Sequence, residues 1–238
     1  MLFLRSCRVF GLLLPHYSHS FPFCGAQSSR LCASWTGVRK RSYWKYLKRS
    51  ILGAPSPPYK WVTQTGDPVL RVQTQLVPQD HISHPDTQAV VKLMVQVLKS
   101  SGCIGLSAPQ LGVPLRILAM ELPEELCQLV PPDVRALREM EPFPLKIFIN
   151  PTMRILDSRK LTFPEGCGSI HGFSAIVPRC YSVEISGLNE KGEHSSWKAQ
   201  GWAARVVQHE MDHLDGILYV DKMDPRTFVN VNWMEVND

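Results

Sequence analysis

The chain has 238 residues, of which 44% are apolar and 20% are charged, an ordinary balance for a soluble globular protein of one sizeable domain or two small ones. No run approaches the roughly 18 uninterrupted apolar residues that a membrane span needs, so we expect no integral membrane segment. Seven cysteines, an odd number without a Cys-x-x-Cys pair, argue against a disulfide scaffold and favour a reducing compartment.

The net charge of +5 is concentrated at the N-terminus. Residues 1–66 contain ten Lys or Arg and no Asp or Glu, whereas the remaining 172 residues hold 16 basic and 21 acidic side chains. A basic, acid-free, Ser-containing leader is typical of a mitochondrial transit peptide, which we predict over residues 1–45, with the mitochondrial matrix as destination. A secretory signal fits less well, because no small-residue cleavage site closely follows Val9–Leu14. A nucleic-acid-binding arm is not favoured either, since the rest of the chain is mildly acidic.

We expect the chain after this leader to form one folded domain. A linker is expected over residues 46–60, ending in the Pro55–Pro58 stretch, and the domain over residues 61–238. A first helix is predicted for Asp86–Ser101, with Asp86 as its N-cap, because its apolar residues recur at helical spacing and Gly102 stands where a C-terminal glycine belongs.

A run of small residues, Cys103–Gly112, follows this helix and surrounds the single amide side chain of Gln110. It lets backbone approach a ligand closely, but it lacks the pattern of a phosphate loop, so nucleotide binding is not indicated. Short β runs are expected at Leu115–Met120, Lys146–Asn150, Met153–Asp157 and Tyr181–Leu188, with one short surface helix near Val134–Glu139. This order predicts an α+β fold, in which mixed or antiparallel sheets pack around a central helix.

The central helix is expected over Trp202–Asp215, with Trp202 and Val206 on the same face as two histidines. With about 3.6 residues per turn, His209 and His213 lie one above the other and can bind one divalent ion. Glu210 lies within reach of a metal-bound water without being a ligand itself.

A catalytic metal site of this kind needs three protein ligands and one open position. Cys167 is the best third ligand, because Gly166 and Gly168 flank it and their missing Cβ atoms let the thiol project from a strand end or turn. The other cysteines of the domain sit among apolar neighbours and are more simply small core residues. Two imidazoles and one thiolate suit Fe²⁺, Co²⁺ or Zn²⁺ alike.

Three motifs in this order resemble those of one family, the peptide deformylases. Cys103–Gln110 resembles their G-φ-G-φ-A-A-x-Q motif, Glu165–Ser169 their E-G-C-L-S motif, and Gln208–Gly216 their Q-H-E-x-D-H-L-x-G motif. The similarity covers roughly Trp61 to the C-terminus, as a single catalytic domain, and the leader suits a mitochondrial member. Three ordered motifs are far more specific than His-Glu-x-x-His alone.

Three positions depart from the family pattern. Cys103 stands where the first motif has its first glycine, and Ser107 replaces its first alanine. Gly168 replaces the leucine of E-G-C-L-S, which keeps a backbone N–H but gives the loop freedom and removes an apolar wall. A catalytically weak, deformylase-like metal-binding protein is therefore one alternative.

The resemblance implies a hydrolase that removes the N-formyl group from the N-terminal formyl-methionine of nascent proteins and releases formate. A metal-bound water would be the nucleophile and Glu210 the general acid and base. The Gln110 side chain and the Gly168 N–H would donate to the oxyanion.

The substrate peptide would pair main chain to main chain with the two loops before the helix. Glu165 is also expected either to orient a metal ligand or to pair with an arginine such as Arg179. The expected substrate-binding residues are Gly66, Ile104, Gly105, Pro164, Glu165 and Gly166.

The residues alone leave two other classes of protein as alternatives. A zinc metallopeptidase of the His-Glu-x-x-His type would need a third ligand after His213, where acids but no further histidine occur. A non-enzymatic protein with a structural metal would need a fourth protein ligand, for which there is no strong candidate. The resemblance implies Fe²⁺ as the native ion, with Co²⁺ or Zn²⁺ in isolated protein, and mitochondrial members imply a homodimer.

Overall fold

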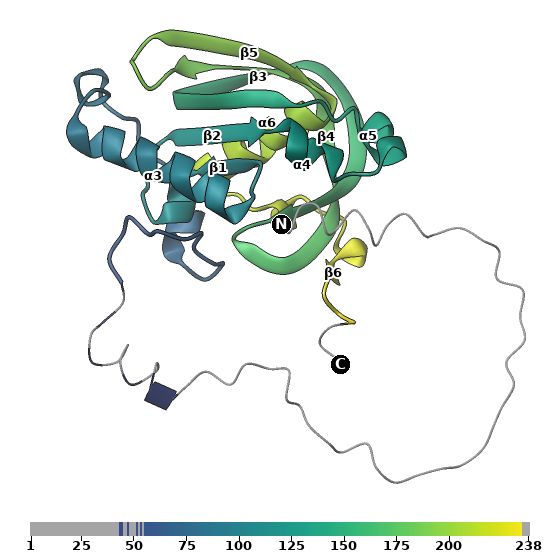
Figure 1. The fold of residues 1–238 in the computed structure, drawn as a ribbon, viewed down its shortest axis with the longest axis horizontal. Helices are drawn as coiled ribbons and strands as arrows, with labels where there is room; N and C mark the ends of the chain where they lie inside the picture. Colours follow the sequence, from purple (N-terminus) through teal and green to yellow (C-terminus); the bar gives the residue numbers. More distant parts are fainter. Residues whose placement is uncertain (1–42, 45–46, 48–50, 52, 54, 235–238) are drawn as a thin grey trace, which may run out of the picture.

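The computed structural model describes residues 43–44, 47, 51, 53 and 55–234 (Figure 1). The transit peptide predicted over residues 1–45 therefore lies almost entirely outside the described residues. Among the described residues, the first backbone hydrogen bond to the rest of the domain comes from Tyr59, whose N–H donates to the Leu111 carbonyl at 2.8 Å. Within the described ranges, no helix combines the length and apolarity that crossing a bilayer requires.

One antiparallel sheet organises the domain. Its strands run in the order β1-β2-β3-β4-β5, and β6 pairs with β4. Their bounds are β1 Gly105–Ser107, β2 Ile117–Leu122, β3 Phe143–Cys167, β4 Ile170–Leu188, β5 His194–Gln200 and β6 Val229–Asn230. The register between the long strands β3 and β4 shifts at several points, and such bulges let a strand pair bend. Figure 1 shows this pair curving around the central helix.

The helices are α3 Pro85–Ser101, α4 Glu124–Gln128, α5 Pro132–Arg138 and α6 Gly201–Leu214. Helix α6 is the central one: it contacts strands β1 to β5, and all of its residues except Ala203 are buried. Its first residue must be glycine, because Gly201 has φ +56° and an added Cβ would lie 2.7 Å from the Glu139 Cβ. The fold thus buries the helix that carries the two histidines.

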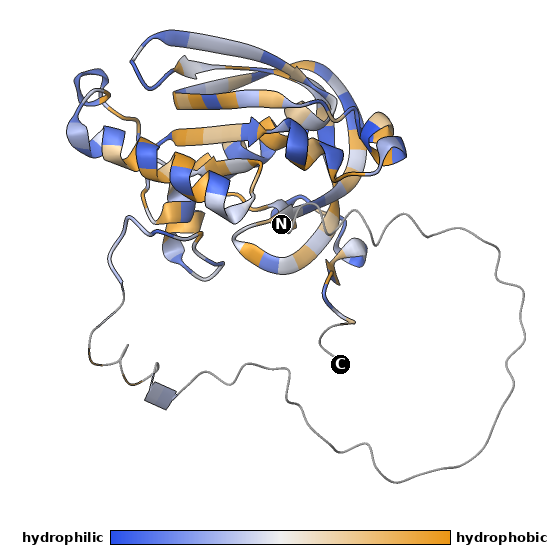
Figure 2. Ribbon diagram, in the orientation of Figure 1, coloured by the Kyte–Doolittle hydropathy of each residue, from blue (hydrophilic) through white to orange (hydrophobic). Residues whose placement is uncertain are grey.

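Strand β2 separates two apolar clusters. Leu118 and Met120 pack in the cluster that includes α6, whereas Ile117 and Ala119 pack in the cluster that includes α3. Because successive side chains of a strand point to opposite faces, a strand covered on both faces reads as a continuous apolar run. Figure 2 shows this run on β2 between the helices.

The predicted α+β class with antiparallel pairing is confirmed, but the predicted strand boundaries are not. Lys146–Asn150 and Met153–Asp157, expected as two strands, belong to the single strand β3. The Asn-Pro pair at 150–151 forms a bulge and does not end the strand. Asn150 has φ +53°, and its side-chain amide exchanges two 2.8 Å hydrogen bonds with the backbone of Val77.

Two helical predictions are also corrected. The N-cap of α3 is His84 and not Asp86, because Pro85 takes the first helical position and His84 Nδ1 accepts from the Asp86 N–H at 3.3 Å. The excursion between β2 and β3 contains α4 as well as the one expected helix, α5. The glycine expected after α3 is confirmed: Gly102 ends the helix with φ +67°.

Candidate metal centre and active site

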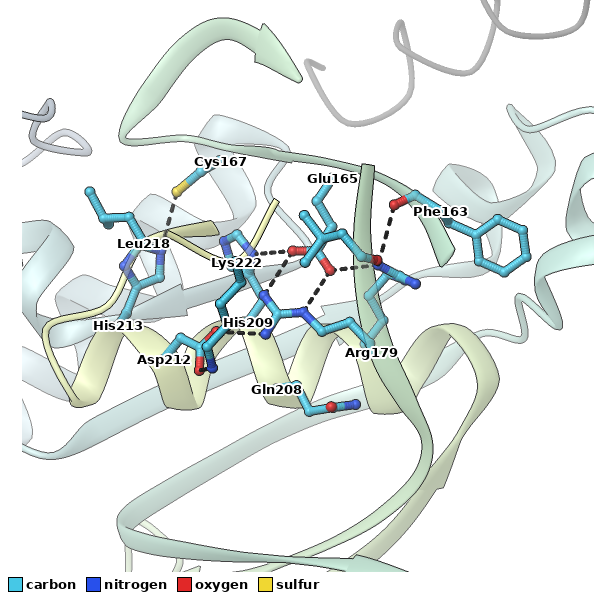
Figure 3. Close-up of polar contacts among 12 residues, drawn as sticks. Phe163, Glu165, Cys167, Arg179, Gln208, His209, Asp212, His213, Leu218 and Lys222 are labelled. Atoms are coloured by element: carbon cyan, nitrogen blue, oxygen red, sulfur yellow. Dashed lines mark hydrogen bonds and ion pairs between the residues drawn. The ribbon is translucent and has the colours of Figure 1, made fainter. Parts of the chain in front are cut away.

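Three buried side chains converge beside α6. The ligand atoms of Cys167, His209 and His213 all lie within 4.8 Å of one another, and Cys167 Sγ is 3.2 Å from His213 Nε2 (Figure 3). The histidines stand one turn apart on α6, and Cys167 is the last residue of β3. Gly168 and Ser169 then turn the chain into β4. The sequence-predicted ligand set is therefore brought together.

Glu165 holds one of these imidazoles in orientation. It lies two residues before Cys167, so strand alternation points both side chains to the same side. Its Oε2 is 3.1 Å from His209 Nδ1, so Nε2 is the ring nitrogen of His209 that would bind a metal. Arg179 donates to the Glu165 carboxylate from Nε and Nη2 at 2.9 Å each, and Arg205 Nη1 donates at 2.7 Å. Both roles considered for the Glu165 side chain thus occur together.

The charges of the cluster follow from these contacts. Burial alone would raise the pKa of Glu165, but hydrogen bonds from Arg179 and His209 outweigh it and hold that pKa well below its usual range. Burial is likewise outweighed at Cys167, where His213 and His209 lower the thiol pKa well below its usual value. The thiolate, which is the form that binds metals, is therefore favoured.

Replacing Glu165 with glutamine is expected to destabilise the protein at pH 7 by about 3 to 5 kcal/mol, because it removes the carboxylate with which buried Arg179 and Arg205 both pair. The folded-state pKa of Glu165 lies below the unfolded value of about 4.3. Its contribution is thus present above about pH 4 and is lost as the pH falls through the folded-state pKa. Urea unfolding of chelator-treated native and Glu165→Gln proteins should show a stability gap that narrows from pH 7 to pH 3.

The exposed Glu125 in α4 supplies the control for this pH series. Glu125→Gln should differ little from the native protein at either pH. A Glu165→Gln gap that stayed constant with pH would contradict the assigned ion pair.

Glu210 is buried next to His209, and its Oε2 has no hydrogen-bond partner among the described residues. Burial raises the pKa of Glu210 to about 7. The carboxylate lies against β1, because an added Cβ at Gly105 would meet Glu210 Oε1 at 2.3 Å. A buried, unpaired acceptor beside one sulfur and two imidazole donors fits a divalent cation with a water molecule in the open position.

Gln110 directs an amide N–H towards the same point. It lies in the 3-10 helix η3 (Ala108–Leu111), and its Oε1 accepts from the Ser107 N–H at 2.9 Å. That bond fixes the amide so that Nε2 lies 3.2 Å from Ser169 Oγ and 3.7 Å from Cys167 Sγ. The predicted donor therefore faces the metal-ligand cluster.

Two strand edges border the cluster. Strand β1 pairs with β2 on one side, and residues 163–167 of β3 pair with β4 on one side, so in the described part of the chain each keeps an unpaired edge. Gly105 lies on the first edge, and Pro164 and Gly166 on the second. The Ile104 carbonyl already accepts from the Glu121 N–H at 2.9 Å, so Ile104 offers mainly its side chain.

An apolar cavity opens between these edges and α6. Trp202, Arg205 and Val206 line it together with five predicted site residues, Ile104, Gly105, Glu165, His209 and Glu210. Trp202 also borders a second cavity, which is lined by Pro164, Gly166, Cys167, Ile170 and Phe173 among others. The lining role of Trp202 and Val206 was missed, although both lie on the helical face that carries the histidines.

Gly66 is a predicted site residue outside both cavities. It has φ +108° and nothing within 4 Å of an added Cβ. Its neighbour Thr65 donates to the Ser169 carbonyl at 2.7 Å, which places Gly66 beside the turn after Cys167. It lines neither of the two cavities described above.

The fold and the cluster define a class: an α+β protein in which a thiol, two imidazoles and a carboxylate surround one buried point. The sequence model of the family described as polypeptide deformylase matches residues 59–228. The chain is 57% identical over 199 residues to "Peptide deformylase, mitochondrial" of Homo sapiens, covering 84% of this chain and 82% of that one. It belongs to the polypeptide deformylase family and is a hydrolase that removes formyl groups.

Further relatives agree. "Peptide deformylase 1A, chloroplastic" of Solanum lycopersicum is 40% identical over 175 residues, covering 74% of this chain and 63% of that one. The crystal structure of a peptide deformylase from Synechococcus elongatus, solved with actinonin, is 30% identical with a TM-score of 0.59. That match covers 77% of this chain and 85% of the other. Family membership sets aside the metallopeptidase alternative.

Proposed function

We propose that this deformylase acts on the N-terminal formyl-methionine of nascent proteins in the mitochondrial matrix and releases formate. The observation that carries the proposal is the convergence of Cys167, His209, His213, the unpaired Glu210 carboxylate and the Gln110 amide between two unpaired strand edges. The basic leader and the mitochondrial relative support the location.

The metal site would consist of Cys167 Sγ and one nitrogen from each of His209 and His213, with one position left open. This donor set suits Fe²⁺, Co²⁺ or Zn²⁺, and we propose Fe²⁺ as the native ion. Such an ion supplies Lewis acidity, which lowers the pKa of water and polarises a carbonyl group.

The residues around the site would divide the chemistry between them. Glu210 takes the proton of the attacking water and returns it to the departing amine, a task suited to a carboxyl group whose pKa lies near neutrality. Gln110 Nε2 and the Gly168 N–H donate to the oxyanion that forms from the formyl oxygen. The products are formate and a peptide with a free N-terminus.

Substrate specificity would come from the two edges and the cavity. The peptide main chain pairs with the edges at Gly105 and at Pro164–Gly166, which accepts many downstream side chains. Glu165 contributes its backbone only, because its side chain is engaged by arginines. The first side chain enters the apolar cavity beside Trp202 and Val206, which suits the unbranched, adaptable side chain of methionine.

The proposal is tested by measuring formate release from formyl-Met, formyl-Glu and formyl-Lys peptides of otherwise equal sequence. The formyl-Met peptide should be hydrolysed about 10²-fold more efficiently, because burying an unpaired charge in the apolar cavity is costly. Equal rates on all three peptides would contradict the assigned cavity. Sedimentation of the same protein tests the proposed homodimer.

Replacing Gln110 with alanine is expected to lower kcat by about 10² to 10³, the range for loss of one oxyanion donor. Metal content should not change, because Gln110 is not among the proposed ligands. Steady-state formate release measures the effect, with Gln128→Ala on the exposed face of α4 as the control. An unchanged kcat in Gln110→Ala would remove Gln110 from the mechanism.

A further inference from the structure

The space above Gly168 is occupied by side chains from two other parts of the chain. An added Cβ at Gly168 would lie 3.2 Å from Val62 Cγ1 and 3.3 Å from Cys103 Sγ, closer than most real contacts of a Cβ atom. Gly168 is not among the glycines with positive φ, so a left-handed backbone does not require glycine there. Crowding by Val62 and Cys103, and not backbone conformation, is what favours glycine there.

Residues 62–65 also tie the Gly168 turn to the Gln110 loop. The Thr63 N–H donates to the Gln110 carbonyl at 2.8 Å, and the Thr65 N–H donates to the Ser169 carbonyl at 2.7 Å. Between them, Gln64 Nε2 donates to the Gly168 carbonyl at 2.9 Å. One short segment therefore contacts the backbone beside both proposed oxyanion donors.

The other end of the Gln64 amide is held as well. Gln64 Oε1 accepts from the His171 N–H at 3.3 Å, so the side chain connects Gly168 in the turn with His171 in β4. The Gly168 carbonyl belongs to the Gly168–Ser169 peptide plane and the Gly168 N–H to the plane before it, so this bond restrains the ψ angle of Gly168 and with it the turn that carries the N–H.

We propose that Val62, Gln64 and Cys103 are positioning residues for Gly168. Val62 and Cys103 fill the space that a side chain at position 168 would take, and Gln64 fixes the Gly168 carbonyl. The proposal rests on the proposed function, because positioning matters for catalysis only if the Gly168 N–H donates to the oxyanion.

This arrangement connects two departures from the family motifs. Cys103 carries a side chain where the first motif has glycine, and Gly168 lacks one where the second motif has leucine. Since the two positions adjoin in space, the volume lost at Gly168 is supplied from Cys103. Leucine at position 168 should therefore lower the activity of this enzyme unless Cys103 is replaced by a smaller residue at the same time.

The coupling is tested with a double-mutant cycle of the metal-loaded full chain: native, Cys103→Gly, Gly168→Leu and the double variant. Gly168→Leu should lower kcat by about tenfold or more, and the double variant should recover most of that loss. The thermal midpoint should show the same non-additivity. Gly168→Leu as active as the native enzyme, or a double variant no better than Gly168→Leu, would overturn the proposal.

Two further measurements keep the cycle interpretable. If Gly168→Leu does not fold, Gly168→Ala probes the same two contacts with a single added carbon. If the native chain releases no formate, the proposed function fails, whereas the thermal midpoints still decide whether Cys103 and position 168 are coupled.

Gln64 is tested separately, because its contact is a hydrogen bond and not packing. Gln64→Glu keeps the size and the acceptor but removes the Nε2 donor, and should lower kcat by about threefold to tenfold with KM and thermal midpoint nearly unchanged. Gln128→Glu on α4 is the matched control. A kcat equal to that of the native enzyme would overturn the role of Gln64.

Discussion

Replacing Glu210 with glutamine is expected to reduce kcat for formate release by about 10²- to 10⁴-fold, the usual contribution of a general base. Glutamine has nearly the same size and fits the site, but it cannot accept the proton of water. Glu210 Oε2 has no hydrogen-bond partner among the described residues, so the exchange breaks no bond to that atom. Fold and metal content should therefore stay as in the native protein.

The measurement compares formate release and metal content in native and Glu210→Gln proteins. Glu125→Gln, on the surface of α4, is the control and should match the native rate. Near-native turnover of Glu210→Gln with a full complement of metal would show that another group takes the proton.

Replacing Cys167 with serine is expected to remove most of the bound metal and the activity with it. A serine hydroxyl is a far weaker ligand than a thiolate whose pKa is lowered by two histidines. Loss of a partner that only orients a ligand costs 10- to 100-fold in affinity, so we expect loss of the ligand itself to exceed about 100-fold.

Cys127→Ser is the matched control, because Cys127 is equally buried but contacts the Met140 carbonyl, away from the metal-ligand cluster. Metal analysis after dialysis, followed by formate release, checks both variants. Full metal occupancy in Cys167→Ser would mean that another residue is the third ligand and would reopen the metallopeptidase alternative.

Local patterns were sufficient to predict the central helix and the three side chains that converge beside it. His209, Glu210 and His213 are linked by the period of one helix, and Cys167 is singled out by the two glycines beside it. Their convergence at one point depends on the tertiary structure, but it requires only that β3 ends next to α6. The clustering of these side chains was therefore predictable.

The strand boundaries were less predictable, because what decides them is distant in sequence. The Asn-Pro pair at 150–151 resembles the end of a strand. The Asn150 side chain, however, pairs with the backbone of Val77, 73 residues earlier, and the strand continues. No pattern near Asn150 in the sequence predicts that Val77 is its partner.

The surroundings of Glu165 and Gly168 show the same limit. The sequence left two roles for Glu165, and both are present because His209 and Arg179 approach the carboxylate together. It did not indicate that Arg205, from the α6 face, would also donate to Glu165 and to the Leu161 and Val177 carbonyls. Gly168 looked like a loss of packing, whereas Cys103 and Val62 fill that space.

We expect one divalent ion, held by Cys167, His209 and His213, to be required for removal of the formyl group. The most direct test adds Fe²⁺, Co²⁺ or Zn²⁺ stepwise to the chelator-treated full chain under anaerobic conditions and follows formate release from a formyl-Met peptide. Activity should rise linearly, stop rising at one ion per chain, and leave every internal peptide bond intact. Full activity without metal, a requirement for two ions, or cleavage within the peptide would contradict the claim.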